Sequence, residues 1–457
     1  MNVRSCAWFV LCCLAPLPVT AAEPLTIIHA GELLAVPGQP VLQQQSILVK
    51  DGAILKVVAG FVNASAVQKA DADVRVVDLS NRFVLPGLID LHVHITMQPL
   101  PGEDLRAVTE SDADLALTGA QNARLTLAAG FTTIVDLGRP GTPGHEAAAF
   151  ALRDAINDGK VPSPRILVSG SPLSATSQSR RPLFRDEVEQ VVGAVAVCDG
   201  ADPCRRAVRE QVRKGADIIS FYSSGSLLYP RPVGQAMTDD EMRAIVETAH
   251  NLGRKVIADG HHAPGIEAAV RAGVDSVDSI HYASDETFQL ILNSGVYMQS
   301  HIYAIAAAVG DTPETLHEGI VWWHPTPVLE RIFDIKMHPF AVERGYRAGI
   351  RKIALATDAG NFPHGDNARD LVEYVKHGVP EMFAIQAATV NAAGVLGLSD
   401  SIGTIEAGKQ ADIIATANSP LKDMSELTRV QFVMRNGTVY KGADRAELQH
   451  TARARAD

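Results

Sequence analysis

The central part of the chain repeats one pattern: an amphipathic stretch of helical periodicity, then a glycine, then a short run of β-branched residues. The glycines stand where a helix is expected to end in the left-handed conformation, which a residue without a Cβ adopts easily. They are Gly130, Gly215, Gly253, Gly273, Gly295 and Gly349. Helix starts agree, because Thr238 to Glu241 (TDDE) forms a capping box before a periodic run. We therefore predict that helices and strands alternate through this region.

Two further strands, around Leu88 to His94 and Arg165 to Ser169, bring the predicted number to eight. Alternating helices and strands build parallel sheets, and eight such units close into a barrel. The predicted fold class is α/β, a (β/α)8 TIM-like barrel over residues 83–401. The alternative, a doubly wound open sheet, requires a glycine-rich phosphate turn after its first strand. That strand ends in histidines here, which favours the barrel.

The two ends of the chain follow a different pattern, with a period of two. SILVKDGAILKVV reads as two strands around an Asp51-Gly52 turn, and FVMRNGTVYKG reads as two more around Asn436-Gly437. We predict that residues 23–82 and 402–442 together form one small β-sandwich. The last residues, 443–457, are expected to be a polar tail.

The first 22 residues are typical of a secretory signal peptide. They carry one arginine, an apolar stretch from Ala7 to Leu17, and small residues before a predicted cut at Glu23. The apolar stretch is too short to span a bilayer, so we expect a periplasmic or secreted protein without membrane insertion after cleavage. Two cysteines remain after cleavage, Cys198 and Cys204. A disulfide is expected in an oxidising compartment, and two unpaired thiols are the alternative.

The formal net charge of −11 at pH 7 argues against nucleic acid as a partner. The expected partner is a small-molecule substrate, and a homo-oligomer remains open. No motif in the chain indicates a larger partner.

The ends of the predicted parallel strands carry the candidate chemistry. Residues two apart on a strand lie on the same face, so His92 and His94 can bind one cation together. Asp358 follows the apolar strand IALAT, and a carboxylate at the end of a buried strand needs a strong partner such as a metal ion or a histidine. We predict a metal site of His92, His94 and Asp358.

Several segments resemble those of the amidohydrolase superfamily, in its imidazolonepropionase-like and prolidase-like branch. They are LPGLIDLHVH (85–94), GFTTIVDLG (130–138), TDAGNFPHGDNA (357–368) and GTIEAGKQADII (403–414). The resemblance implies an HxH pair on strand one, a carboxylated lysine on strand four, a histidine on each of strands five and six, and an aspartate on strand eight. In that family these residues hold two zinc ions, and the aspartate also takes a proton from the activated water. Asp358 stands at the position of this aspartate, so the resemblance implies that it is the catalytic base.

The match to this ligand set is partial. Ser220 stands at the position of the bridging lysine, and a serine cannot be carboxylated. Asp259 and Ser279 stand at the two histidine positions. We therefore expect one divalent metal ion per chain, zinc being the expected metal, because a catalytic zinc needs only three protein ligands. His261 and His281, each two residues further on, are candidate replacement ligands on the same strand face, and Asp259 is another.

Substrate contacts are expected from the loops that follow the strands. Tyr222, His301 and Tyr303 are the candidates, and Trp322 to His324 is an aromatic cluster that suits an apolar ligand or packs against the rim of the barrel. The predicted function is hydrolysis of an amide, lactam or peptide-like C–N bond by a metal-activated water in the periplasm. The alternative is a binding protein that kept the fold without the metal.

Overall fold

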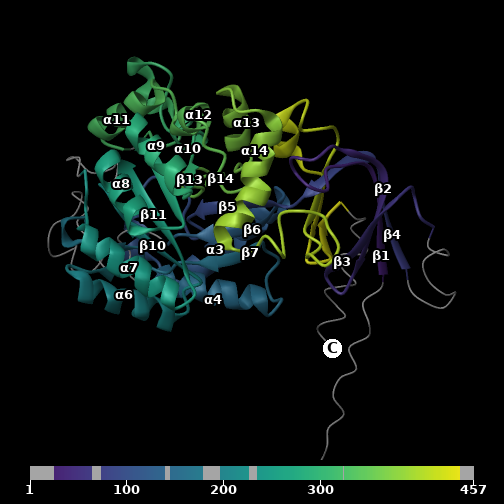
Figure 1. The fold of residues 1–457 in the computed structure, drawn as a ribbon, viewed down its shortest axis with the longest axis horizontal. Coiled ribbons are helices and arrows are strands. Elements are labelled where there is room, and N and C mark those ends of the chain that lie inside the picture. Colours follow the sequence, from purple (N-terminus) through teal and green to yellow (C-terminus); the bar gives the residue numbers. More distant parts are fainter. Residues whose placement is uncertain are drawn as a thin grey trace, which may run out of the picture.

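The structure is a computed structural model that describes residues 25–63, 74–138, 145–178, 196–225, 234–322 and 324–442 (Figure 1). The predicted signal peptide and the predicted polar tail lie outside these residues, as does Trp323. Within the described part of the chain, no helix is both long and apolar enough to span a membrane.

The centre of the molecule is made of parallel strands. One sheet has the order β5-β6-β7, and a second has the order β14-β13-β12-β11-β10-β8-β9. A parallel bridge between Val93 and Ala359 joins the first strand of this series to the segment that follows its last strand. This arrangement is consistent with a TIM-like barrel. The strands are β5 (Leu88–Val93), β6 (Phe131–Asp136), β7 (Arg165–Val168), β8 (Leu173–Ser174), β9 (Ala196–Val197), β10 (Ile218–Tyr222), β11 (Lys255–His262), β12 (Ser276–Tyr282), β13 (Tyr297–Ser300) and β14 (Ile353–Leu355).

Helices alternate with these strands, as the sequence pattern predicts, and Figure 1 shows α6 to α9 around the outside of β10 and β11. The capping box of Thr238 and Glu241 is present at the start of α7. Gly273 ends α8 in the left-handed conformation. The longer helices are α3 (Asp112–Ala128), α4 (His145–Asn157), α6 (Ala201–Lys214), α7 (Asp239–Asn251), α8 (Ala263–Ala272), α9 (Asp285–Ser294), α11 (Thr326–Lys336), α12 (Ala341–Arg347), α13 (Arg369–Lys376), α14 (Glu381–Gln386) and α15 (Ala392–Leu396).

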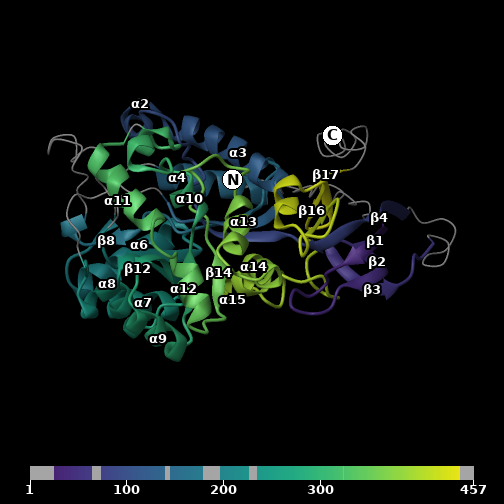
Figure 2. The same cartoon turned by 90° about the horizontal axis from the view of Figure 1, so that it is seen from above.

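Strands from both chain ends join in one seven-stranded sheet at the side of the molecule, in the order β17-β16-β15-β4-β1-β2-β3 (Figure 2). The two predicted hairpins are confirmed, with Asp51 and Asn436 at φ of 51° and 48° in their turns. The strand β4 pairs with β1 and with β15, and it runs past residue 82, the predicted boundary. The strands are β1 (Leu25–Leu33), β2 (Leu42–Lys50), β3 (Ala53–Ala59), β4 (Val74–Pro86), β15 (Ile413–Thr416), β16 (Phe432–Arg435) and β17 (Thr438–Lys441).

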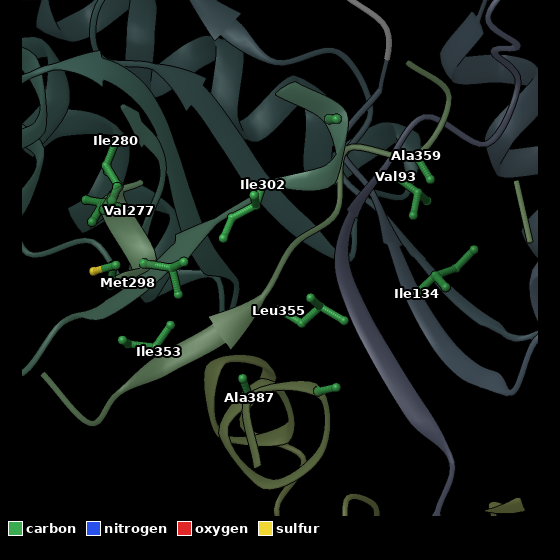
Figure 3. Close-up of a cluster of buried hydrophobic side chains, with 14 of the residues drawn as sticks. Val93, Ile134, Val277, Ile280, Met298, Ile302, Ile353, Leu355, Ala359 and Ala387 are labelled. Atoms are coloured by element: carbon green, nitrogen blue, oxygen red, sulfur yellow. The ribbon is translucent and has the colours of Figure 1, made fainter. Parts of the chain in front are cut away.

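A continuous hydrophobic core lies between the parallel strands and the surrounding helices. Figure 3 shows part of it, where Met298 and Leu355 lie between neighbouring strands and Val93 lies near Ala359. These side chains are fully buried. Because protein interiors are closely packed, the strand ends above this core have little freedom to shift. The polar residues at those ends are therefore held in fixed positions.

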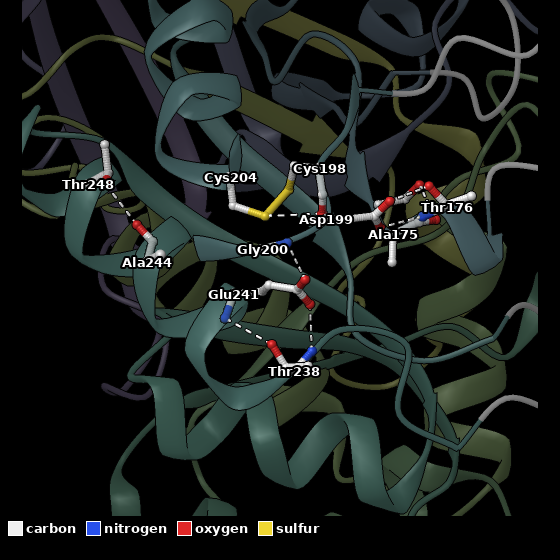
Figure 4. Close-up of a disulfide and its surroundings, with 11 residues drawn as sticks. Ala175, Thr176, Cys198, Asp199, Gly200, Cys204, Thr238, Glu241, Ala244 and Thr248 are labelled. Atoms are coloured by element: carbon white, nitrogen blue, oxygen red, sulfur yellow. Dashed lines mark hydrogen bonds between the residues drawn. A yellow bond between two sulfur atoms is a disulfide. The ribbon is translucent and has the colours of Figure 1, made fainter. Parts of the chain in front are cut away.

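The expected disulfide between Cys198 and Cys204 is present, in the loop that leads into α6 (Figure 4). The same loop is tied to the start of α7, because the Glu241 carboxylate accepts hydrogen bonds from the backbone N–H groups of Gly200 and Thr238. The disulfide closes a small ring on the outside of the parallel sheet.

Replacing Cys198 and Cys204 together by serine should lower the free energy of unfolding by about 2 kcal/mol, because the crosslink restricts only a short loop in the unfolded chain. Denaturant titration of the variant and of the native protein measures this difference. The native protein in reductant is the control and should match the variant. Equal midpoints for all three samples would contradict the prediction.

Candidate metal centre

The histidine pair is placed by the first parallel strand. β5 ends at Val93, with His92 inside the strand and His94 directly after it. Both side chains are buried, at 4% and 7% exposure, although histidine is a polar residue. A polar side chain in such a position needs a defined partner.

Asp358 reaches the pair because its loop is bound to β5 along the backbone. The N–H of Asp358 donates to the carbonyl of His92 (2.8 Å), and the N–H of His94 donates to the carbonyl of Ala359 (2.7 Å). Asp358 adopts a φ of 64°, a left-handed conformation that is uncommon for residues other than glycine. Strained backbone of this kind is found at functional sites, where the surrounding structure holds it in place.

The three ligand atoms form a compact triangle. His92 Nε2 lies 3.2 Å from His94 Nε2. The Oδ1 atom of Asp358 lies 3.0 Å from His94 Nε2 and 3.5 Å from His92 Nε2. Ligands about 2.0–2.1 Å from a tetrahedral zinc ion lie about 3.3 Å from one another. Among the described residues, this is the group of three histidine, cysteine or acidic side chains with the geometry to hold a metal ion.

The outer nitrogens of both rings have acceptors. His92 Nδ1 lies 2.5 Å from Asp278 Oδ2, and His94 Nδ1 is hydrogen-bonded to the carbonyl of Gly138. A hydrogen on each Nδ1 leaves the Nε2 lone pair free to face the centre of the triangle. Histidine ligands of metals are usually held by such a carboxylate or carbonyl. The residues present therefore fit a divalent cation.

The charges of the centre favour the ionised forms. Burial by itself lowers the pKa of His92, but the nearby Asp278 and Asp358 carboxylates outweigh it and raise that pKa to about 10. Burial likewise disfavours the Asp358 carboxylate, but His92 and His94 hold its pKa well below the ordinary range. Without a cation, a proton on His92 balances part of the negative charge.

Asp278 should control the affinity for the cation without binding it. Replacing Asp278 by Asn should weaken cation binding by about 10- to 100-fold, the usual cost of losing the carboxylate behind a histidine ligand. Competition with a fluorescent chelator measures the affinity. Asp285→Asn is the control, because the Asp285 side chain is 91% exposed. An unchanged affinity in Asp278→Asn would show that the carboxylate does not orient His92.

A second buried carboxylate, Asp90, joins the first and last strands. It accepts hydrogen bonds from the N–H and hydroxyl of Thr357 and from Asn367 Nδ2. Burial raises the pKa of Asp90 to about 6, and these hydrogen bonds oppose the rise. Asp90 thereby fixes Thr357, the neighbour of Asp358. The sequence analysis missed this role, although Asp90 lies in the same segment as His92.

The structure places the candidate replacement ligands beside this triangle. His281 Nε2 lies 3.2 Å from His301 Nε2, and the rings of His261 and His281 are stacked with centroids 5.3 Å apart. Asp259 Oδ1 lies 3.8 Å from His261 Nε2. Burial and the neighbouring Asp278 raise the pKa of Asp259 to about 7. These side chains extend the polar cluster along β11 and β12.

The prediction that Ser279 and His281 share a strand face depended on a regular strand, and β12 is irregular at this point. Ser279 and Ile280 have φ of 70° and 35°, and the pairing of β11 with β12 shifts by one residue there. Such a bulge interrupts the alternation of side chains along a strand, so a spacing of two does not by itself give the same face. Asp278, one residue earlier, is the side chain that reaches His92. Asp278 was not predicted, because the family resemblance indicated the next residue, Ser279, as the ligand position.

The remaining candidates have contacts outside the triangle. Ser220 is buried, and its hydroxyl donates to the hydroxyl of Ser169 (3.3 Å). Tyr222 ends β10 and pairs in register with Asp259. The ring of Tyr303 lies edge-on against Phe362, with centroids 5.0 Å apart.

Comparison with known proteins agrees with this geometry. The model of the Amidohydrolase family matches residues 83–441. The chain belongs to the amidohydrolase family. This membership identifies it as a hydrolytic enzyme acting on C–N bonds, in a family whose members typically bind a divalent metal. The resemblance described from the sequence segments is thereby confirmed.

Relatives with known names cover almost the whole chain. An ochratoxinase from Aspergillus niger is 29% identical over 466 residues, which cover 93% of this chain and 89% of the relative. A crystal structure of a Xaa-Pro dipeptidase with methionine in its active site is 30% identical, with a TM-score of 0.78, over 92% of this chain and all of that one. An imidazolonepropionase from Symbiobacterium thermophilum is 24% identical over 85% of this chain and 90% of its own.

Proposed function

We propose that this amidohydrolase is an exported, metal-dependent enzyme that cleaves an amide, lactam or peptide-like bond with an activated water. The observation that carries the proposal is the triangle of His92 Nε2, His94 Nε2 and Asp358 Oδ1, with both outer histidine nitrogens held by acceptors. One divalent cation, zinc, is proposed for this position.

The residues of the metal centre have different proposed roles. A divalent cation bound there supplies Lewis-acid activation of water and of the scissile carbonyl group. Asp358 stays ionised because His92 and His94 hold its pKa low, and its Oδ2 is the oxygen that does not face this histidine pair. Asp278 and the carbonyl of Gly138 keep the two imidazoles in the tautomer that leaves Nε2 open. Asp358 is therefore proposed as the general base.

Cation binding should depend on pH through His92. Since its pKa is raised to about 10, the ring holds a proton at neutral pH that a cation must displace. The affinity of the protein for the cation should then rise about tenfold per pH unit between pH 6 and 9, and about one proton should be released for each cation bound. Calorimetric titration in buffers of different ionisation enthalpy counts the protons. Affinity that does not change with pH would contradict a protonated His92.

The relatives suggest the class of substrate. One relative is named an ochratoxinase, and another is named a Xaa-Pro dipeptidase, an enzyme that acts on dipeptides. We propose that this enzyme cleaves an N-acyl amino acid or a dipeptide, with Tyr222 and Tyr303 as substrate contacts. Hydrolysis assays with ochratoxin A and Xaa-Pro dipeptides test this substrate class. Each assay is run on the protein as purified, after a chelator has removed the metal, and after zinc has been added back. A protein that takes up no cation and cleaves none of these would support the metal-free binding protein.

Two further proposals concern the architecture and the location. We propose that residues 83–401 form a closed barrel, supported by the Val93–Ala359 bridge between its first strand and the segment after its last strand. A separate core that joins Ile28 and Ile47 to Ile413 and Phe432 supports a β-sandwich built from both chain ends. Export is supported by the Cys198–Cys204 disulfide, and the intact mass of the secreted protein should correspond to a start at Glu23.

A further inference from the structure

Asp259 lies in a row of side chains that crosses the ends of three parallel strands. Tyr222 of β10 pairs in register with Asp259 of β11, and Asp259 pairs with Asp278 of β12. Paired residues on adjacent parallel strands point to the same face, and the strands are about 4.8 Å apart. Since Asp278 Oδ2 lies 2.5 Å from His92 Nδ1, this face is the one that carries the metal centre. Asp259 is therefore a neighbour of that centre on the β11 side.

The backbone around Asp259 is held by the segment that follows β10. The N–H and the hydroxyl of Ser223 both donate to the carbonyl of Asp259, at 2.8 and 3.2 Å. The hydroxyl of Ser224 accepts hydrogen bonds from the N–H groups of His261 (2.7 Å) and His262 (3.1 Å). These contacts fix the end of β11, so the Asp259 side chain is presented from a rigid position.

One oxygen of the Asp259 carboxylate has no hydrogen-bond donor. Oδ1 is buried and accepts no hydrogen bond from any described residue, and His261 Nε2 lies 3.8 Å from it. Leaving a buried carboxylate oxygen without a donor is costly, so such an oxygen normally has one. A ligand with an N–H group would supply this donor.

The metal centre keeps a negative charge after one divalent cation has bound. Among the described residues, the ion-pair partners of Asp259, Asp278 and Asp358 are all histidines, and none is a lysine or an arginine. Three carboxylates outweigh the two positive charges of one cation. Asp358 belongs to the triangle and Asp278 supports His92, whereas Asp259 is outside the group of side chains that can hold an ion. The remaining negative charge therefore falls to Asp259.

We propose that Asp259 binds the positively charged α-amino group of the substrate, which makes a dipeptide with a free amino terminus the preferred substrate. The inference rests on the proposed function and narrows its substrate class, because an N-acyl amino acid has no such charge. A single carbon separates the α-amino group from the scissile carbonyl, so the amino group lies close to the cation when that carbonyl does. A carboxylate on a strand beside the centre can then receive it in a charge-assisted hydrogen bond. This role replaces the predicted role of Asp259 as a metal ligand.

Two compounds that differ in one group test this proposal. Ala-Pro carries an ammonium group where its isosteric analogue, L-lactoyl-proline, carries a hydroxyl. The zinc-loaded native protein should cleave Ala-Pro with a kcat/KM about 10- to 100-fold higher, the usual value of a buried hydrogen bond to a charged group. Calorimetric titration of the chelated protein with the same two compounds should give the same order of affinity in the absence of turnover.

Asp259→Asn removes the charge and keeps the shape of the side chain. It should lower kcat/KM for Ala-Pro, so that the preference over lactoyl-proline falls below about threefold. Asp285→Asn is the matched control and should keep the native preference, because that side chain is 91% exposed. Thermal unfolding establishes that both variants are folded, and the preference of the native protein is measured independently of either variant.

A second pair of compounds locates the ammonium group. N-acetyl-Ala-Lys and N-acetyl-Ala-norleucine differ in a side-chain ammonium group, which is several bonds further from the scissile carbonyl, and they should be cleaved at equal rates. A preference for the lysine compound that Asp259→Asn abolishes would assign the carboxylate to a substrate side chain and overturn the assignment to the α-amino group.

The remaining outcomes separate this proposal from the proposed function. Equal cleavage and equal binding of Ala-Pro and lactoyl-proline by the native protein would overturn the role of Asp259 and leave the hydrolase intact. A preference for Ala-Pro that survives in folded Asp259→Asn would also overturn it, because another group would then bind the amine. Cleavage of neither compound with zinc present would count against the proposed function, and the calorimetric comparison would still decide whether Asp259 binds the amine.

Discussion

Replacing His92 by Ala should remove the tightly bound cation and reduce hydrolysis by at least about 10³-fold, since Lewis-acid activation contributes several kcal/mol to lowering the barrier. Two ligand atoms, His94 Nε2 and Asp358 Oδ1, would remain 3.0 Å apart, which is one fewer than a catalytic zinc needs. His94→Ala should have the same effect. Elemental analysis of the dialysed protein and steady-state kinetics measure the two losses independently.

His250→Ala is the control for this experiment, because His250 lies on α7 and pairs with Asp275 at the surface. It should keep both metal and activity. A His92→Ala variant that is folded and retains a full equivalent of tightly bound metal would show that the triangle is not the binding site. A variant that loses metal but keeps activity would instead remove the metal from the mechanism.

Replacing Asp358 by Asn should lower kcat by about 10²- to 10⁴-fold, the usual contribution of a general base. Asparagine tolerates the left-handed backbone that Asp358 adopts at a φ of 64°, so the loop should keep its conformation. The amide cannot accept the proton, and it is a weaker ligand than a carboxylate. The variant should therefore also bind the cation less tightly, which saturating zinc in the assay corrects.

Asp358→Ala provides the contrast. It removes the same base but also strains the backbone, so it should unfold at a lower temperature than Asp358→Asn. Thermal unfolding of both variants, with kinetics at saturating zinc, separates the two effects. Activity of Asp358→Asn close to that of the native enzyme would assign the base to another residue of the cluster.

The order of helices and strands was predictable because it depends on local physics. Each helix covers the sheet with one apolar face and ends at a residue free to turn, which leaves a periodic pattern and a glycine such as Gly273. The hairpin turns at Asp51 and Asn436 follow from the same local preferences. The joining of both chain ends in one sheet agrees with the composite domain predicted from their two hairpin patterns.

The sequence by itself also determined the core of the site. His92 and His94 are two residues apart at the end of one strand, and Asp358 follows another buried strand. The three side chains converge if the two strands are parallel, because parallel strands end at the same edge of the sheet. Spacing alone could not identify Asp278, because the bulge at Ser279 and Ile280 changes which side chain of β12 faces the centre. Alternation is a reliable guide only while the strand stays regular.

Only the tertiary structure brought His301 to Asp358, where its Nε2 lies 3.8 Å from Asp358 Oδ2. The position of His301 depends on Asp370 and Tyr374, which lie about 70 residues further along the chain on α13. Contacts between residues so distant in sequence leave no periodic signal, because they arise from packing of whole elements and not from the local conformation of either one.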